Sequence, residues 1–156
     1  MIDIARLAAL IAVLGTAIVY GTDVFCAVVQ RPALARVDDR ALVAVMGNVH
    51  AYGDRRMPLP GAVGVVGAAA SAALAAAAGR TTEAIAAGAA VVLLLAWLVL
   101  YLRVSAPINR QLTAAAHADR VPANARVLQH DWDRIIVARA ALQGLAVAAL
   151  CLALVR

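Results

Sequence analysis

Four stretches of the chain are almost wholly apolar, and polar residues collect between them. The apolar stretches cover about residues 4–29, 61–79, 84–104 and 135–155. With a helical rise of ~1.5 Å per residue, each is about long enough to cross the ~30 Å hydrocarbon core of a bilayer. The pattern therefore predicts an all-α fold, an integral membrane four-helix bundle in which residues 1–156 form a single domain.

The composition supports this assignment. The chain is 65% hydrophobic and 15% charged, whereas soluble domains have about 25% charged residues. All 14 basic residues are arginine, and they lie beside the apolar stretches rather than on one soluble face, so a nucleic-acid surface is excluded. The motifs of nucleotide-binding and hydrolase folds are absent from the sequence. Arg6 precedes the first stretch without a cleavage site, so we expect an uncleaved span.

Two polar regions, residues 31–60 and 105–133, are expected to be loops that carry short amphipathic helices. Pro32 is predicted to end the first helix, and Pro107 to end the third. In the first loop Asp38 or Asp39 can cap a helix with one apolar face, and that helix is predicted to lie flat on the membrane surface. The apolar face consists of Leu42, Val45, Met46 and Val49.

Other boundaries follow from single residues. A second surface helix is expected over residues 112–118, Pro122 is expected to start the last helix, and Thr82 to cap the third span. Trp97 and Tyr101 lie near the far end of the third span, where aromatic residues favour the headgroup region, so we interpret them as interface anchors.

The arginines predict an orientation. The two loops and their flanks hold ten of them, whereas the other side holds only Arg6, Arg80 and Arg156. The positive-inside rule then predicts a multi-pass protein of the cell's inner (cytoplasmic) membrane, with both loops in the cytoplasm and both termini outside.

Polar residues in the first span follow one another on one helical face. They are Thr16, Tyr20, Asp23 and Gln30, at intervals of four, three and seven. This stripe should face protein rather than lipid. Two interpretations stay open, a polar seam that helps helices pack and a ligand pocket.

The last helix contains an arginine inside its apolar part. Arg139 shares a face with Trp132 and Gln143, at intervals of seven and four. A charge in hydrocarbon costs at least ~2.5 kcal/mol and needs a partner. Asp23 is the carboxylate at matching depth in an apolar stretch, so we predict a bidentate pair between Asp23 and Arg139. The alternative is that Arg139 reaches the headgroups instead.

Three further features bear on function. The segment from His50 to Pro58 holds His, Tyr, Asp and two Arg beside the bilayer, and either binds an anion, metal or polar substrate or is a solvated anchor. The second span is rich in small residues and reads as a packing helix that offers a surface for a homo-oligomer. Cys26 and Cys151 lie near opposite ends of their spans, too far apart for a disulfide, so both are expected to be free and buried.

Short motifs in the chain are similar to those of the anthrone-oxygenase-like family of small four-helix membrane proteins. The motifs are Pro107-Ile108-Asn109 with Leu112, Trp132 followed seven residues on by Arg139, and Pro32-Ala33-Leu34. The resemblance implies oxidation of an anthrone to a quinone with molecular oxygen as co-substrate. The sequence departs from the family at Ile136, where a polar residue is expected, and His130 is a candidate to take over that role.

The chemistry of such a reaction requires a base, a donor for the oxyanion and a dry pocket. His130 or His50 would be the base, and Arg139 or Tyr20 would stabilise the anion. Candidate substrate-binding residues are Asp23, Thr16, Trp132, Asn109 and Arg55. A variant of this hypothesis uses haem or a transition metal, with His50, His130 and Asp54 as ligands.

A second hypothesis is a non-catalytic module that binds lipid, quinone or haem, or an assembly partner. Under both hypotheses the expected partners are membrane lipid and an apolar small molecule, and no nucleic acid is expected. A homo-oligomer through the second span is a further option.

Overall fold

The computed structural model describes residues 3–155, and nearly all of them are helical. No strand occurs within this range, which confirms the all-α prediction. The helical elements are α1 Ile4–Phe25, η1 Cys26–Gln30, α2 Arg31–Leu34, α3 Asp39–Arg56, α4 Pro58–Ala77, α5 Thr81–Leu100, η2 Tyr101–Ser105, α6 Ala106–His117 and α7 Ala125–Val155. Arg156, which is predicted to lie at the outer end of the last helix, falls outside the described residues.

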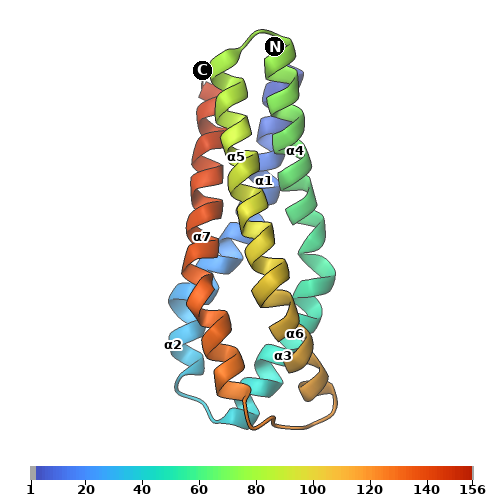
Figure 1. The fold of residues 1–156 in the computed structure, drawn as a ribbon, viewed down its shortest axis with the longest axis vertical. Helices are drawn as coiled ribbons and strands as arrows, with labels where there is room; N and C mark the ends of the chain where they lie inside the picture. The colour runs from blue at the N-terminus through green and yellow to red at the C-terminus, as the bar shows by residue number, and fades with distance from the viewer. Residues whose placement is uncertain (1–2, 156) are drawn as a thin grey trace.

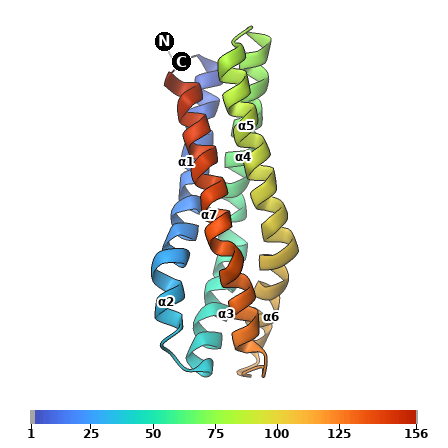
Figure 2. The same ribbon diagram turned by 60° about the vertical axis from the view of Figure 1, so that its left-hand side comes forward.

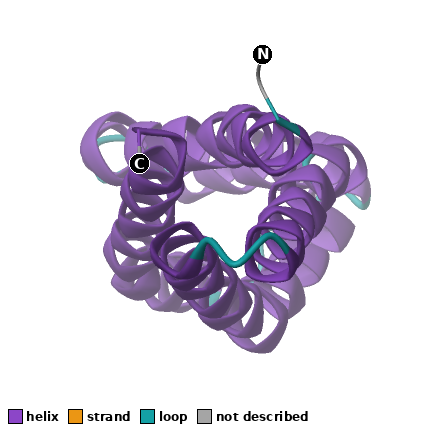
Figure 3. Ribbon diagram, turned by 90° about the horizontal axis from the view of Figure 1, so that it is seen from above, coloured by secondary structure: helices purple, strands orange, loops and turns teal. Residues whose placement is uncertain are grey.

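The elements form four long rods that run up and down side by side (Figures 1 and 2). The four rods are formed by α1 with α2, by α3 with α4, by α5 with α6, and by α7 alone. Viewed from above, they surround one axis (Figure 3). Four helical stretches are long and apolar enough to cross a membrane: Ile4–Leu34, Pro58–Ala77, Thr81–His117 and Ala125–Val155. The chain is therefore a multi-pass membrane bundle. Both termini and the α4–α5 turn lie at one end (Figure 1).

Neither of the two prolines predicted to end a helix does so. Each lies in the first turn of a new helix that directly follows a wider π-turn. Before Pro32 the last hydrogen bond of the π-turn runs from Arg31 N–H to the Cys26 carbonyl, and before Pro107 it runs from Ala106 N–H to the Tyr101 carbonyl. A proline in a first turn needs no N–H partner, and the wide turn lets the helix continue. Consequently the expected long loops shrink to residues 35–38 and 118–124.

The prediction that α3 lies flat on the membrane is also wrong. α3 stands upright and packs along α6, so it extends the bundle (Figure 2). Leu42 and Met46 are buried as predicted, but Val45 and Val49 are exposed. A Cβ at Gly47 would overlap the Leu112 carbonyl, so the glycine allows the two helices to approach this closely. An apolar helical face can pack against a membrane or against a partner helix. In this protein the partner helix is α6, which determines the orientation of α3.

Several helix starts also differ from the sequence prediction or refine it. Asp38 is the N-cap of α3, with its carboxylate accepting a bond from Ala41 N–H at 2.7 Å. α7 begins at Ala125 rather than at Pro122. α5 begins one residue after Arg80, so Thr82 lies inside the helix and is not its cap.

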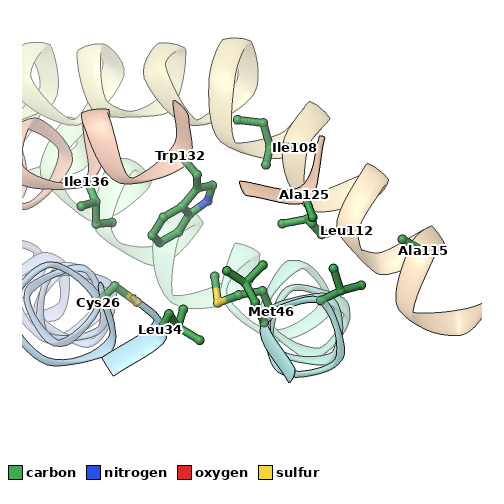
Figure 4. Packing of buried hydrophobic residues seen from close by; sticks show 11 residues of the cluster. Cys26, Leu34, Met46, Ile108, Leu112, Ala115, Ala125, Trp132 and Ile136 are labelled. Carbon is green, nitrogen blue, oxygen red and sulfur yellow. The ribbon is translucent and has the colours of Figure 1, made fainter. Parts of the chain in front are cut away.

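The bundle has two apolar cores of different composition. One, around Met46, Leu112, Trp132 and Ile136, lies at the end that holds α2, α3 and α6 (Figure 4). The other is built mainly from small side chains of α1, α4, α5 and α7: Ala12, Ala68, Ala90, Leu94, Ala146 and Leu150. Small residues allow membrane helices to pack closely, which confirms that α4 is a packing helix.

The small face of α4 is used inside the molecule. Gly64 lies against Thr16, and Gly67 lies against Ala12, both on α1. The face of α4 that holds Gly64 and Gly67 is therefore covered by α1 of the same chain, and a homo-oligomer through the second span stays a prediction. The thiol prediction holds for Cys26, which is free and buried, but Cys151 is free and exposed on the outside of the bundle.

Candidate functional site

A buried ion pair joins the first and last rods. Asp23 of α1 and Arg139 of α7 are 2% and 6% exposed, and Arg139 Nη2 donates to Asp23 Oδ1 at 2.8 Å. This confirms the predicted pair. The predicted bidentate geometry is wrong, because the other terminal nitrogen of Arg139 donates to Ser105 Oγ at 2.8 Å. One guanidinium thus ties together α1, η2 and α7.

The second oxygen of Asp23 has two neutral donors. Gln143 Nε2 lies 2.6 Å and Trp97 Nε1 3.3 Å from Asp23 Oδ2. The guanidinium carbon of Arg139 also lies 5.6 Å from the ring centre of Tyr101 and the same distance from that of Trp132. Hydrogen bonds, an opposite charge and aromatic faces together offset the cost of burying both ions.

A second network runs beside the first. Asp54 of α3 accepts bonds from the Tyr101 hydroxyl and from Asn109 Nδ2, each at 2.8 Å. Asn109 Oδ1 in turn accepts a bond from Trp132 Nε1 at 3.0 Å. The network connects α3, η2, α6 and α7 at the level of the π-turn η2.

His50 of α3 is buried one helical turn before Asp54. It is 4% exposed, and its ring centre lies 5.5 Å from that of Trp132. Burial lowers the pKa of His50 to about 4, although the charge of Asp54 opposes this shift and that of Arg139 adds to it. The imidazole is therefore neutral at pH 7, because burial favours the uncharged form.

Two buried nitrogens of this region have no hydrogen-bond partner within the described residues. They are His50 Nε2 and Arg139 Nε. Leaving a buried polar atom unpaired costs about 1–3 kcal/mol, and native proteins rarely do so. Both residues contact Trp132, so the two unpaired nitrogens belong to one region of the bundle.

A cavity of about 550 Å³ lies between the rods at this level. Its lining comes from α1, η1, α3, α4, α5, η2, α6 and α7: Val19, Thr22, Asp23, Cys26, Gln30, Met46, Val49, His50, Gly53, Asp54, Met57, Pro58, Gly61, Ala62, Val65, Val66, Trp97, Leu98, Tyr101, Leu102, Asn109, Trp132 and Arg139. Most of these side chains are apolar, as in sites for small molecules. Val49, Val66 and Leu102 are also exposed, so the cavity reaches the outer surface.

Six of the predicted site residues line this cavity. They are Asp23, His50, Asp54, Asn109, Trp132 and Arg139. The structure thus brings together residues that are up to 116 positions apart in the chain.

Four predicted site residues lie elsewhere. The His130 side chain is 75% exposed, with Asp131 3.8 Å away, so the cavity has only His50 as a candidate histidine base. Thr16 is buried against Gly64, and Tyr20 lies against Gly144, so both serve helix packing. Arg55 is exposed on α3.

The predicted metal ligands are not assembled around one point. His130 points away from the cavity, and Asp54 Oδ1 is occupied by Tyr101 and Asn109. Among residues 3–155 no group of three or more His, Cys, Asp or Glu side chains is placed to hold a metal ion. His50 and Asp54 are the two members of the predicted set that the cavity contains.

The interpretation of Trp97 and Tyr101 as interface anchors is wrong. Trp97 is buried and donates to Asp23, and Tyr101 is half-buried and donates to Asp54. Their rings stack with centres 6.2 Å apart. The spacing of four between Trp97, Tyr101 and Ser105 is a signal that could have placed all three on the inner face of the helix.

Comparison of the chain with protein-family models, curated proteins and solved structures finds no match in any of the three.

Proposed function

We propose that the protein is a membrane-embedded oxidoreductase, and that it oxidises an apolar aromatic ketone with molecular oxygen. The observation that carries the proposal is the cavity itself, with mainly apolar walls and two unpaired buried nitrogens in His50 and Arg139. An apolar ring with a single oxygen function is complementary to such a site. The motif resemblance to the anthrone-oxygenase-like family supports the same class of reaction.

The substrate enters from the bilayer. Val66 and Leu102 line the cavity and are 66% and 56% exposed on membrane-spanning segments. An apolar molecule dissolved in the lipid therefore reaches the cavity without crossing water. The mainly apolar walls then disfavour water beside the reactive carbanion.

Neutral His50 acts as the base in the first step. It takes a proton from the methylene group beside the aromatic ring, and the electron pair moves onto the ketone oxygen. Arg139 stabilises the resulting oxyanion through its free Nε–H, as donors do at sites where negative charge develops. Because His50 has a pKa of about 4, proton removal is uphill and depends on this stabilisation.

Oxygen then traps the carbanion. One electron passes to O2 and the two radicals combine, which forms a C–O bond and, with the proton from His50, a hydroperoxide. Loss of the second methylene proton and cleavage of the O–O bond release water and leave a new carbonyl group. The balance is CH2 + O2 → C=O + H2O, and the aromatic ketone becomes a quinone.

The test uses the protein in lipid nanodiscs with anthrone as the probe. We expect oxygen uptake and quinone absorbance in equal amounts. His50→Gln should lower turnover by about 10²-fold or more, the usual contribution of a general base. His130→Gln is the matched control, because the same change falls on an exposed side chain outside the cavity, and it should leave turnover unchanged. Equal losses in both variants, or none in His50→Gln, would refute the role of His50.

The alternative function is a non-catalytic site for a quinone or similar ring. The low pKa of His50 favours it, since a neutral imidazole is better suited to hydrogen bonding a carbonyl group than to removing a proton. Saturable binding of the probe at one site per chain, without oxygen uptake, would show that the protein binds and does not oxidise.

We also propose that the protein lies in the cell's inner (cytoplasmic) membrane, with the end that holds connections 35–38 and 118–124 facing the cytoplasm. The excess of arginine at that end supports this orientation. A Thr81→Cys variant should react with an impermeant thiol reagent from outside intact cells, and reaction only after permeabilisation would reverse the orientation.

A further inference from the structure

Unbalanced positive charge is concentrated at one end of the bundle. Residues 31–57 and 101–134 contain ten arginines and six aspartates. At the opposite end Arg6 and Arg80 are matched by Asp3 and Glu83, with ion pairs of 3.2, 2.5 and 2.9 Å. Within the described part of the chain, the second end is therefore locally neutral and the first is not.

Four exposed arginines of the charged end lie at one depth. They are Arg55 and Arg56 of α3, Arg103 of η2 and Arg134 of α7, and we call them the arginine belt. Each lies 21 or 22 residues along its rod from the far end of α4, α5 or α7. At ~1.5 Å per residue this is about 32–33 Å, just beyond the ~30 Å hydrocarbon core.

The belt arginines have no carboxylate partner. Among residues 3–155 none of the four lies within 4 Å of an acidic side chain. The nearby carboxylates are engaged elsewhere, since Asp54 accepts bonds from Tyr101 and Asn109, and Asp133 accepts one from Gln129 at 2.8 Å. The positive charge of the belt therefore faces outward.

The surface beside the belt is apolar. Leu59, Val99 and Leu102 lie next to it along the chain on the membrane side and are 73%, 55% and 56% exposed. On the other side Tyr52 is exposed, and the Arg56 guanidinium lies 4.9 Å from its ring centre. Apolar residues followed by cations match the acyl chains and the phosphate of an anionic phospholipid, and an exposed tyrosine beside them is typical of the headgroup region.

We propose that the arginine belt binds the phosphate groups of anionic phospholipids and selects these lipids over zwitterionic ones. The guanidinium group donates two parallel hydrogen bonds to a phosphate, and the negative lipid surface attracts basic residues at this depth. The proposal is independent of any catalytic function of the cavity.

The test measures which lipids surround the protein. The wild-type chain is reconstituted in vesicles of equal parts phosphatidylglycerol and phosphatidylcholine, extracted with a polymer that retains the surrounding lipid, and the lipid is quantified by mass spectrometry. We expect enrichment of phosphatidylglycerol over the vesicle composition. In single Arg→Gln variants of the belt this preference should fall by about fivefold, which corresponds to about 1 kcal/mol per arginine.

The control is a variant with the same loss of charge farther from the membrane. Arg31, Arg36, Arg110 and Arg120 are exposed, also lack an acidic partner within the described residues, and lie beyond the belt toward the connections. The four-fold Arg→Gln variant of the belt should lose the preference, and the control variant should keep most of it. Circular dichroism confirms that both variants are folded. Equal losses in the two variants, or a retained preference in the belt variant, would overturn the proposal.

A second arm separates lipid phosphate from free phosphate. Inorganic phosphate added at matched ionic strength should leave the phosphatidylglycerol enrichment unchanged when compared with chloride. A selective loss of enrichment with phosphate would show that the belt is a site for the free anion and would refute lipid selection.

Discussion

Breaking the Asp23–Arg139 pair should be the most destabilising polar change available in the bundle. Asp23→Ala leaves a buried guanidinium without its counter-ion and removes the acceptor of both Trp97 and Gln143. Removing one partner of a buried pair costs about 3–5 kcal/mol. Arg139→Ala should cost a similar amount, because it leaves the Asp23 carboxyl buried without its counter-ion and Ser105 without its donor.

The double variant should lose much less than the sum of the single losses. It contains no unpaired charge, and only neutral groups such as Trp97, Gln143 and Ser105 lose a partner, at about 1–3 kcal/mol each when they stay buried. We therefore expect a coupling energy of roughly 2 kcal/mol between the two positions. The assay is reversible unfolding in mixed micelles, with the free energy of unfolding measured for all four chains of the cycle.

The exposed pair Arg40–Asp119 provides an internal comparison. Its side chains are 70% and 85% exposed, with nitrogen and oxygen 3.0 Å apart. Exposed pairs of this kind contribute about 0–1 kcal/mol. A coupling energy for Asp23 and Arg139 no larger than that for Arg40 and Asp119 would refute the reasoning, since burial is the only difference on which the larger value depends.

Two further predictions concern α3. His50 has a folded-state pKa of about 4 against an ordinary 6.5, so its contribution to stability should be complete above pH 6.5 and be lost as pH falls toward 4, by up to ~3 kcal/mol. The difference in unfolding free energy between the wild type and His50→Gln should follow that pH dependence, and a constant difference would contradict it. Gly47→Ala should destabilise the protein by ~1–3 kcal/mol, because its Cβ would overlap Ala116 Cβ and lie 2.5 Å from the Leu112 carbonyl oxygen. Gly53→Ala in the same helix is the control, because its Cβ meets no atom within 4 Å, and it should be neutral or stabilising by up to ~1 kcal/mol. Equal effects of the two changes in thermal unfolding would show that close packing of α3 on α6 does not cause the loss of stability in Gly47→Ala.

The membrane bundle and its central ion pair could be predicted from the sequence. A long apolar stretch is stable in lipid as a helix, because a helix forms all of its backbone hydrogen bonds within the segment. A lone carboxylate and a lone guanidinium at matching depths in such helices have strong reason to pair, as Asp23 and Arg139 do. The small residues of α4 likewise predicted close packing, and Gly64 against Thr16 bears this out.

The cavity, and the place of Trp97 and Tyr101 in its walls, could not be predicted from the sequence and became clear only from the tertiary structure. Trp97 and Tyr101 have the composition of interface anchors, and only the rotation of their helix against α1 and α3 turns them toward Asp23 and Asp54. His130 and His50 are equally plausible bases in the sequence, yet one is exposed and the other buried. Short-range patterns carry no information on helix rotation, which the packing of all four rods determines together.

The sequence by itself determined the membrane class, the number of spans and the buried charges, because each of these follows from the free energy of placing a local segment in lipid. Only the tertiary structure decided that Pro32 and Pro107 continue their helices through π-turns and that α3 stands upright against α6. Both outcomes depend on a neighbouring element. A proline or an amphipathic face is compatible with several local structures, and the partner that buries it selects one.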